Sequence, residues 1–302
     1  MTRCAVRRLA AAIALGGASA CAGGLPPPPA PTNPIRFLSI NDVYVADTLP
    51  EGSGGLARVA AMRDRIALEG PTLLLLAGDF LSPSALSRLT SGRHMVDALN
   101  AARVDYVTFG EHEFDLPRDT LLARIRDSHF TWLSVNCTEP AGGPLPGSVP
   151  WDTLRLAERK IGLFGLTIPG PYPDYVRCGD PDAAARRAVD TLVAQGAELI
   201  VAVTHQAIET DRRMLNRENR IDLVLGGHEH EAQSLSISGR HILKADANAR
   251  TVQFATVWGA KGQWRQAVTL LPVHGGLPSD SATAAVVAAW QDTLRLRSAS
   301  DH

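Results

Sequence analysis

The stretch LVLGGHEHEA (Leu223–Ala232) places two histidines one residue apart, directly after an apolar run. That run (Ile221–Leu225) is short, rich in β-branched residues and followed by two glycines, which is typical of a buried strand that ends in a tight turn. His228 and His230 are therefore expected where a strand leaves the core. Neutral imidazole is a common ligand of transition metals, but a pair of histidines also fits a solvated loop. The residues that follow the other predicted strands indicate whether this pair is part of a metal site or of a solvated loop.

Five further predicted strands also end in polar residues. These strands are Ile35–Ile40, Thr72–Ala77, Val104–Phe109, Thr131–Val135 and Glu198–Val203. The polar residues that follow them are Asp42, Asp79, Glu111 with His112 and Asp115, Asn136, and His205. Any one of them would be an ordinary turn or cap residue, but six strand ends of this kind indicate one ligand-binding edge of a sheet.

The donor set at this edge combines carboxylates with imidazoles. Such a mixture favours Mn, Fe, Zn or Co over Ca and Mg, which prefer oxygen ligands alone. A structural zinc site of the finger type is excluded because the sequence has no paired cysteines. Two ions bridged by a carboxylate would suit phosphoryl transfer.

Strands and helices alternate along most of the chain. The last predicted strands, in HILKAD, TVQFATVW and WRQAVTLL, follow one another without helices, and a helix is expected from Ser281 to Leu296. This order predicts a sheet-rich, layered α/β domain. Residues 35–302 contain no second linker and no internal repeat, so we expect one domain.

Residues 1–21 read as a bacterial lipoprotein signal. Arginines precede an apolar stretch (Leu9–Leu15), and small residues lead to Cys21, the expected lipidation site. Ordinary signal cleavage nearby is the alternative. The apolar stretch is too short to span a bilayer. Residues 22–34 form a linker rich in proline and glycine, so we expect a domain in the periplasm or cell envelope, held to the membrane by a lipid anchor.

The charge of the chain bears on its partners, and its cysteines bear on a possible disulfide. A net charge of -1 without a basic run gives no reason to expect a nucleic-acid polymer as partner. Outside the cytoplasm, Cys137 and Cys178 could form a disulfide, but the sequence does not show whether their geometry allows it.

The ordered series NDVY, GDFLSPS, GEHEFD, SVN, THQ and GGHEH resembles the calcineurin-like metallophosphoesterases, most closely the catalytic domain of the 5'-nucleotidase branch. The resemblance runs from about Ile35 to Val273. It implies a four-layer αββα sandwich, with two divalent or iron-type ions at the carboxyl ends of the strands. It also implies hydrolysis of a small phosphorylated substrate by a metal-bound hydroxide, without a covalent intermediate.

The resemblance implies a role for each motif residue. Asp79 would bridge the two ions, Asp42 and His230 would bind the first ion, and the second would be held by Glu111, His205 and His228. His112 would stabilise the transition state or assist the leaving group, with Asp115 orienting its ring. Asn136 is a candidate substrate contact. Arg250 lies where a contact to phosphate is plausible, although a basic residue on a strand edge is more often solvated.

Two positions depart from the family pattern. Tyr44 replaces a histidine that the family uses in the first motif, and Glu111 replaces an asparagine. Tyr44 is either a ligand of a ferric ion or a wall residue, and the first site should be the weaker one. The alternative to an enzyme is a degenerate lipoprotein that binds a metal or a phosphorylated ligand without turnover. His112 with Asp115 favours turnover. Because the sequence ends soon after Val273, we expect no nucleotide-binding second domain, and nucleotide selectivity does not follow from the resemblance.

Overall fold

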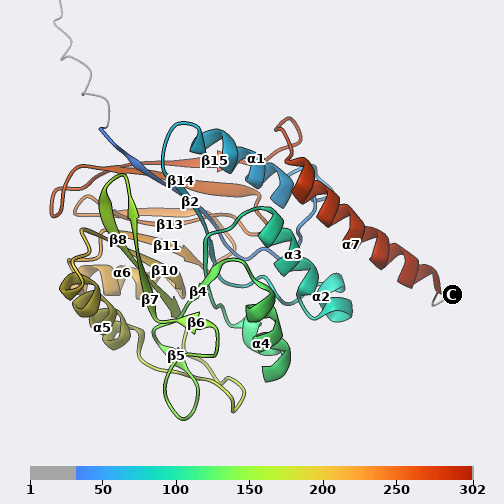
Figure 1. Cartoon of the computed structure of the whole chain (residues 1–302), viewed down its shortest axis with the longest axis horizontal. Helices are drawn as coiled ribbons and strands as arrows, with labels where there is room; N and C mark the ends of the chain where they lie inside the picture. The colour runs from blue at the N-terminus through green and yellow to red at the C-terminus, as the bar shows by residue number, and fades with distance from the viewer. Residues whose placement is uncertain (1–31, 301–302) are drawn as a thin grey trace, which may run out of the picture. The chain divides into compact units, whose positions relative to one another are not determined.

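The computed structural model describes residues 32–300 (Figure 1), with no account of the side chains of 298–300. The described residues belong to one compact unit, Pro31–His302. The predicted signal, Cys21 and most of the predicted linker lie outside the described residues. Within residues 32–300, no helix is both long and apolar enough to cross a bilayer.

The first sheet carries four of the predicted strand ends on parallel neighbours. Its order is β15 (Arg265–Pro272), β14 (Thr251–Trp258), β1 (Ile35–Ile40), β2 (Thr72–Ala77), β3 (Tyr106–Thr108), β4 (Thr131–Leu133) and β6 (Ser148–Val149). Strands β1 to β4 pair in parallel, whereas β14 is antiparallel to β1. The carboxyl ends of β1, β2 and β3 therefore meet at one edge.

The second sheet repeats this arrangement. Its order is β12 (Gln233–Ile237), β13 (Arg240–Lys244), β11 (Leu223–Gly227), β10 (Leu199–His205), β8 (Arg159–Thr167) and β7 (Trp151–Leu156). Strands β8, β10, β11 and β13 run parallel, with antiparallel strands at both edges. A two-stranded sheet joins β5 (Cys137–Thr138) to β9 (Arg177–Cys178).

Helices cover the outer face of each sheet. The first sheet is covered by α1 (Leu56–Ala67), α3 (Arg93–Ala101), α4 (Arg118–Asp127) and α7 (Ser281–Ser300), and the second by α5 (Pro181–Ala194) and α6 (Ile208–Arg217). Helix α2 (Ala85–Thr90) packs against α3 and α7. In Figure 1 these two groups of helices flank the sheets from opposite sides. The predicted four-layer αββα sandwich is thus confirmed.

The alternating directions of the side chains of β2 show why the sequence folds into these layers. Leu73 and Leu75 belong to the apolar cluster between the sheets, whereas Leu74 and Leu76 belong to the cluster under the helices of the first sheet. Successive strand side chains point to opposite faces, so a continuous apolar run must be buried on both. Burying one such side chain stabilises the fold by about 1.5–3 kcal/mol.

Several elements differ from the sequence prediction. Strand β3 is shorter than Val104–Phe109, and the hairpin of β7 and β8 and the edge strand β12 were not predicted. The C-terminal helix continues to Ser300. The open question of the cysteines is answered, because Cys137 and Cys178 are joined by a disulfide that links β5 to β9.

His94 on α3 provides a test of burial against pH. It is 2% exposed, its Nδ1 lies 2.7 Å from the Thr90 hydroxyl, and burial lowers the pKa of His94 to about 4. The unfolded chain binds this proton below about pH 6.5, so the stability that neutral His94 confers is present above that pH and is lost as the pH falls toward 4. Between pH 7 and 5 the free energy of unfolding should fall by about 2 kcal/mol from this group. Urea unfolding of wild type and His94→Asn measures it, and an equal fall in both would contradict the assignment.

Candidate metal centre

The predicted ligand residues from both sheets meet at one place. Asp42 follows β1, Asp79 follows β2 and Glu111 follows β3, while His205 ends β10 and His228 follows β11. Strand β10 packs against β2, and β11 packs against both β1 and β2. The carboxyl ends of the two sheets thus face each other across the apolar layer that the sheets share.

Glu111, His205 and His228 form the tightest group. Glu111 Oε2 lies 2.9 Å from His205 Nε2, and Glu111 Oε1 lies 3.0 Å from His228 Nδ1. Nevertheless Glu111 Oε2, His205 Nε2 and His228 Nδ1 are buried without a hydrogen-bond partner. Buried polar atoms without partners are rare, and lone pairs that converge without bonding to one another fit a shared cation. These residues therefore fit a metal ion.

The neighbours of His205 determine its tautomer. Its Nδ1 lies 2.7 Å from the carbonyl oxygen of Ala77, which can only accept, so Nδ1 donates. In the neutral ring this leaves the lone pair on Nε2 free for a metal. Burial lowers the pKa of His205, but Asp79, Glu111 and Asp42 raise it further, so that it lies well above the usual value. The surrounding carboxylates thus favour a positive charge at this position.

Asp79 belongs to more than one candidate group. It is grouped with Asp42 and His205, and also with Glu111 and His112. Asp42 and Asp79 are almost fully buried. This shared position is what a bridging carboxylate requires, and the bridging role of Asp79 stays a prediction. The second grouping means that His112 also lies within reach of a metal ion.

The Tyr44 hydroxyl lies among the residues predicted for the first ion. It donates to Asp79 Oδ2 at 3.1 Å, and its oxygen is 3.5 Å from Asp42 Oδ1 and 3.2 Å from His230 Nε2. Burial and the two carboxylates raise the pKa of Tyr44 above its usual value, so the phenol keeps its proton when no cation is near. The Tyr44 hydroxyl therefore lies in direct contact with the residues predicted to bind the first ion.

His230 is the most exposed of the predicted ligands. Its Nε2 is 3.3 Å from Asp42 Oδ1, but its side chain is 54% exposed. It belongs to none of the candidate groups among the described residues. The structure therefore provides more protein contacts for an ion at Glu111 than for one at His230.

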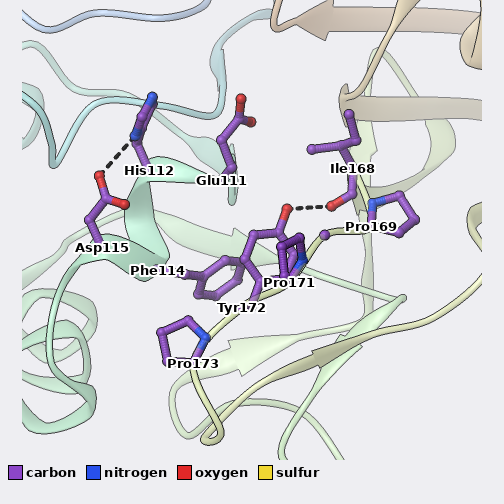
Figure 2. A pocket seen from close by; sticks show the side chains of 10 residues that line it. Glu111, His112, Phe114, Asp115, Ile168, Pro169, Pro171, Tyr172 and Pro173 are labelled. Atoms are coloured by element: carbon purple, nitrogen blue, oxygen red, sulfur yellow. Dashed lines mark hydrogen bonds and ion pairs between the residues drawn. The ribbon is translucent and has the colours of Figure 1, made fainter.

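His112 and Asp115 lie on a short 3-10 helix, η1 (His112–Asp115), beside this cluster. His112 Nδ1 is 2.8 Å from Asp115 Oδ2 (Figure 2), and the His112 backbone N–H donates to Asp79 Oδ1 at 2.9 Å. Burial lowers the pKa of His112, but the hydrogen bond to Asp115 and the charge of Asp79 raise it above the usual value overall. With Nδ1 directed to Asp115, Nε2 is available to a ligand.

Glu113 is a site residue that the sequence did not reveal. It is fully buried and accepts backbone hydrogen bonds from Asp79 at 2.9 Å, Phe80 at 2.8 Å, Leu81 at 3.0 Å and Gly110 at 2.7 Å. One carboxylate thereby joins the turns that follow β2 and β3. Its position within GEHEFD offered no signal, because the neighbouring acidic residues look alike in sequence.

Asn41 and Asn248 hold the turn after β1 and were also missed. Asn41 Nδ2 donates to Asp42 Oδ2 at 2.7 Å, and the side-chain oxygen of Asn248 accepts from the backbone N–H groups of Tyr44 and Val45 at 2.9 and 3.1 Å. These bonds fix the orientation of Asp42 and the path of the chain at Tyr44.

The middle residue of HEH points inward rather than toward the metal centre. Glu229 Oε2 lies 2.6 Å from Lys244 Nζ, which also contacts Asp211 Oδ2 at 3.1 Å. Lys244 is 1% exposed and donates to the carbonyl oxygens of Gln206 at 2.6 Å and Gly227 at 2.8 Å. A buried charge is tolerated only when it is paired and hydrogen-bonded, as this one is. Glu229 therefore anchors the turn that carries the two histidines.

The backbone at the centre adopts an uncommon conformation. Four predicted ligands have positive φ: Asp42 (52°), Asp79 (57°), His228 (93°) and His230 (63°). This region is sparsely populated by residues other than glycine. Such residues cluster at functional sites, where the surrounding structure holds them in place.

Two glycines allow the chains to approach closely here. A Cβ on Gly110 would lie 2.0 Å from Asp79 Oδ1, and a Cβ on Gly227 would lie 2.4 Å from the carbonyl oxygen of Ala77. Any larger residue would push the strand ends apart. Gly110 is thus required where the turns after β2 and β3 approach each other, and Gly227 where the two sheets pack closely.

The two predicted substrate contacts have other partners. The Asn136 amide is buried and exchanges hydrogen bonds with the backbone of Thr167, donating at 2.7 Å and accepting at 3.0 Å. Arg250 pairs with Glu51 at 3.1 Å on an exposed surface. Their roles toward substrate stay predictions.

Comparison with known proteins identifies the family. The family model described as calcineurin-like phosphoesterase matches residues 35–232. A snake venom 5'-nucleotidase from Naja atra is 28% identical over 190 residues, which cover 58% of this chain and 35% of the relative. The chain thus spans about a third of the length of that curated relative.

Two solved structures share the fold. A 5'-nucleotidase precursor from Thermus thermophilus superposes with a TM-score of 0.76 at 22% identity, covering 87% of this chain and 59% of that one. A calcineurin-like phosphoesterase from Bacillus subtilis has a TM-score of 0.75 at 17% identity, covering 88% of this chain and 99% of that one. At these identities the likeness concerns the fold alone. Because the family model spans most of the sequence, the chain belongs to the calcineurin-like phosphoesterase family.

Proposed function

We propose that this protein is a metal-dependent phosphoesterase that hydrolyses small phosphate esters, in the manner suggested by its 5'-nucleotidase relatives. The observation that carries the proposal is the set of converging, buried ligand atoms of Glu111, His205 and His228, which lack a hydrogen-bond partner. His112, oriented by Asp115, lies next to them. A mixed carboxylate and imidazole set supports Mn, Fe, Zn or Co as the resident ion.

Some site residues would hold metal ions, and others would position the proton donor. Asp79, Glu111, His205 and His228 would hold one ion, and Asp42, His230 and the shared Asp79 a second. Bound ions supply Lewis acidity and an activated water nucleophile. His112 Nε2 can donate to the oxygen of the leaving group, while Asp115 holds its ring and tautomer.

The test combines metal analysis with an activity assay. Purified protein is loaded separately with Mn, Fe, Co and Zn, and hydrolysis of a phosphomonoester and a phosphodiester is measured. We expect turnover of at least one ester that disappears with a chelator and returns with metal. If metal-loaded protein hydrolyses neither ester, the result would support the alternative function, a degenerate lipoprotein that binds a ligand without turnover. The Tyr44 hydroxyl in the first site favours this alternative.

Tyr44 should limit occupancy of the first site. Because a phenol replaces an imidazole there, dialysed wild type should retain closer to one ion than two, and Tyr44→His should raise that number. Tyr44→Phe keeps the ring without the hydroxyl and is the matched control. Elemental analysis gives the stoichiometry, and retention of two ions by wild type would contradict the expectation. A visible absorption band of the iron-loaded protein that disappears in Tyr44→Phe would identify Tyr44 as a ferric ligand.

We also propose that the mature protein is anchored in the cell envelope through Cys21, since the signal and the proline-rich linker suit that location together. Cys21→Ser should move the protein from the membrane fraction to the soluble fraction. Cys4→Ser, within the same signal, should leave the location unchanged. Unprocessed wild type in the cytosol would refute the proposal.

A further inference from the structure

A pocket of about 470 Å³ opens beside His112. One side is formed by Glu111, His112 and Asp115 with Phe114, and the other by the segment Ile168–Pro173 (Figure 2). Its volume lies within the range of pockets that hold small organic molecules. A group bound there would lie directly next to the residue that faces the leaving group in the proposed reaction.

The segment Ile168–Pro173 is held in place before any ligand binds. The Tyr172 hydroxyl donates to the carbonyl oxygen of Ile168 at 2.5 Å, and the Tyr172 ring packs on Phe114 with 4.9 Å between centroids. The Ile168 N–H donates to the carbonyl oxygen of His205 at 2.7 Å. This wall is thereby tied to β10, the strand that carries a predicted metal ligand.

The same segment is poorly suited to an anion. None of the described residues that line the pocket is a lysine or an arginine, and the positive charge that His112 can carry is paired with the Asp115 carboxylate. Prolines stand at 169, 171 and 173 and have no N–H, and the N–H of Ile168 already has its partner. Anion sites are built from backbone N–H groups or cationic side chains, and this wall offers few of the former and none of the latter.

We propose that Ile168–Pro173 forms a leaving-group pocket that accepts uncharged or cationic alcohols and rejects those with a second negative charge. The inference rests on the proposed phosphoesterase function. Proline rings and Tyr172 offer flat apolar surfaces that suit a ring-containing alcohol. Monophosphate esters of neutral cyclic alcohols are thus preferred over bisphosphates, polyphosphates and phosphorylated carboxylic acids.

The test uses three aryl phosphates that differ only in a remote charge. Phenyl phosphates with a 3-hydroxymethyl, 3-aminomethyl or 3-carboxymethyl group are compared by kcat/KM with metal-loaded protein. Wild type should disfavour the carboxylate by about tenfold relative to the neutral ester. Pro171→Arg should reduce or reverse that ratio and lower the rate with the ammonium ester. Pro173→Arg is a second variant, and thermal unfolding verifies that both fold.

Pro278→Arg is the matched control, because it adds the same charge at an exposed proline on the segment that leads into α7. Its ratios should equal those of wild type. Active wild type without discrimination, or folded and active arginine variants with unchanged ratios, would overturn the pocket assignment and leave the phosphoesterase function standing. Absence of hydrolysis with all three esters in metal-loaded wild type would overturn the pocket assignment, and absence of phosphodiester hydrolysis as well would overturn the phosphoesterase function.

Discussion

Asp79→Asn is expected to remove most bound metal and to lower kcat/KM by at least about 10³-fold, since the metal ion that would stabilise the transition state by several kcal/mol is lost with its ligand. The asparagine amide has nearly the shape of the carboxylate, so the variant tests the loss of the negative charge of Asp79. Asp79 Oδ2 lies 3.3 Å from His205 Nε2, and Oδ1 accepts from the His112 N–H at 2.9 Å. Elemental analysis and steady-state kinetics measure the two losses.

The control for this variant is Asp190→Asn. Asp190 makes an ion pair with Arg220 at 2.8 Å on the surface of α5, and such exposed pairs contribute little to stability. It should retain wild-type metal content and activity. If Asp79→Asn retained the wild-type metal content, Asp79 would not be a ligand, and the proposed centre would have to be redrawn around Glu111.

His112→Asn should retain metal yet lose on the order of 10²–10⁴ in rate, the range typical of acid–base groups. The loss should be smaller for 4-nitrophenyl phosphate than for an alkyl phosphate, because a good leaving group needs less help from a proton donor. This split separates a group that assists the leaving oxygen from one that only shapes the site.

Metal content decides whether His112 has been assigned correctly. It lies within reach of an ion shared with Asp79 and Glu111, so a ligand role is geometrically open. A loss of metal in His112→Asn as large as that in Asp79→Asn would make His112 a ligand, and the proton-donor role would be wrong.

The row of polar residues at the carboxyl ends of the strands could be predicted from the sequence, because it follows from the parallel direction of the strands. Parallel strands deliver their carboxyl ends to one side of a sheet, so Asp42, Asp79 and Glu111 had to lie along one edge once their strands were recognised, whereas His205 and His228 come from the second sheet. The helices and buried strands were readable for the same reason, since their apolar periods are strong. The hairpin of β7 and β8 was missed in part because β7 lies at the edge of its sheet, where burial is partial and the apolar pattern weak.

The inner supports of the centre could not be predicted, because nothing in their spacing distinguishes them. Glu113 lies two residues from the predicted ligand Glu111, and Glu229 lies between the predicted ligands His228 and His230. Yet both side chains turn inward, that of Glu113 to four backbone N–H groups and that of Glu229 to Lys244. Only the three-dimensional course of the turns decides which of two adjacent acidic side chains faces a metal. The Cys137–Cys178 bond was undecidable for the same reason.

The positive φ angles of Asp42, Asp79, His228 and His230 set a limit on how far this protein can be made thermostable. Each such residue costs of the order of 1–3 kcal/mol, and glycine would relieve that strain. Glycine at 228 would even keep the backbone hydrogen bond to Asp42. It would also delete a predicted ligand. Stabilising substitutions chosen by backbone preference alone will therefore fall on residues that the proposed activity requires, and a heat-resistant variant has to gain its stability elsewhere in the sandwich.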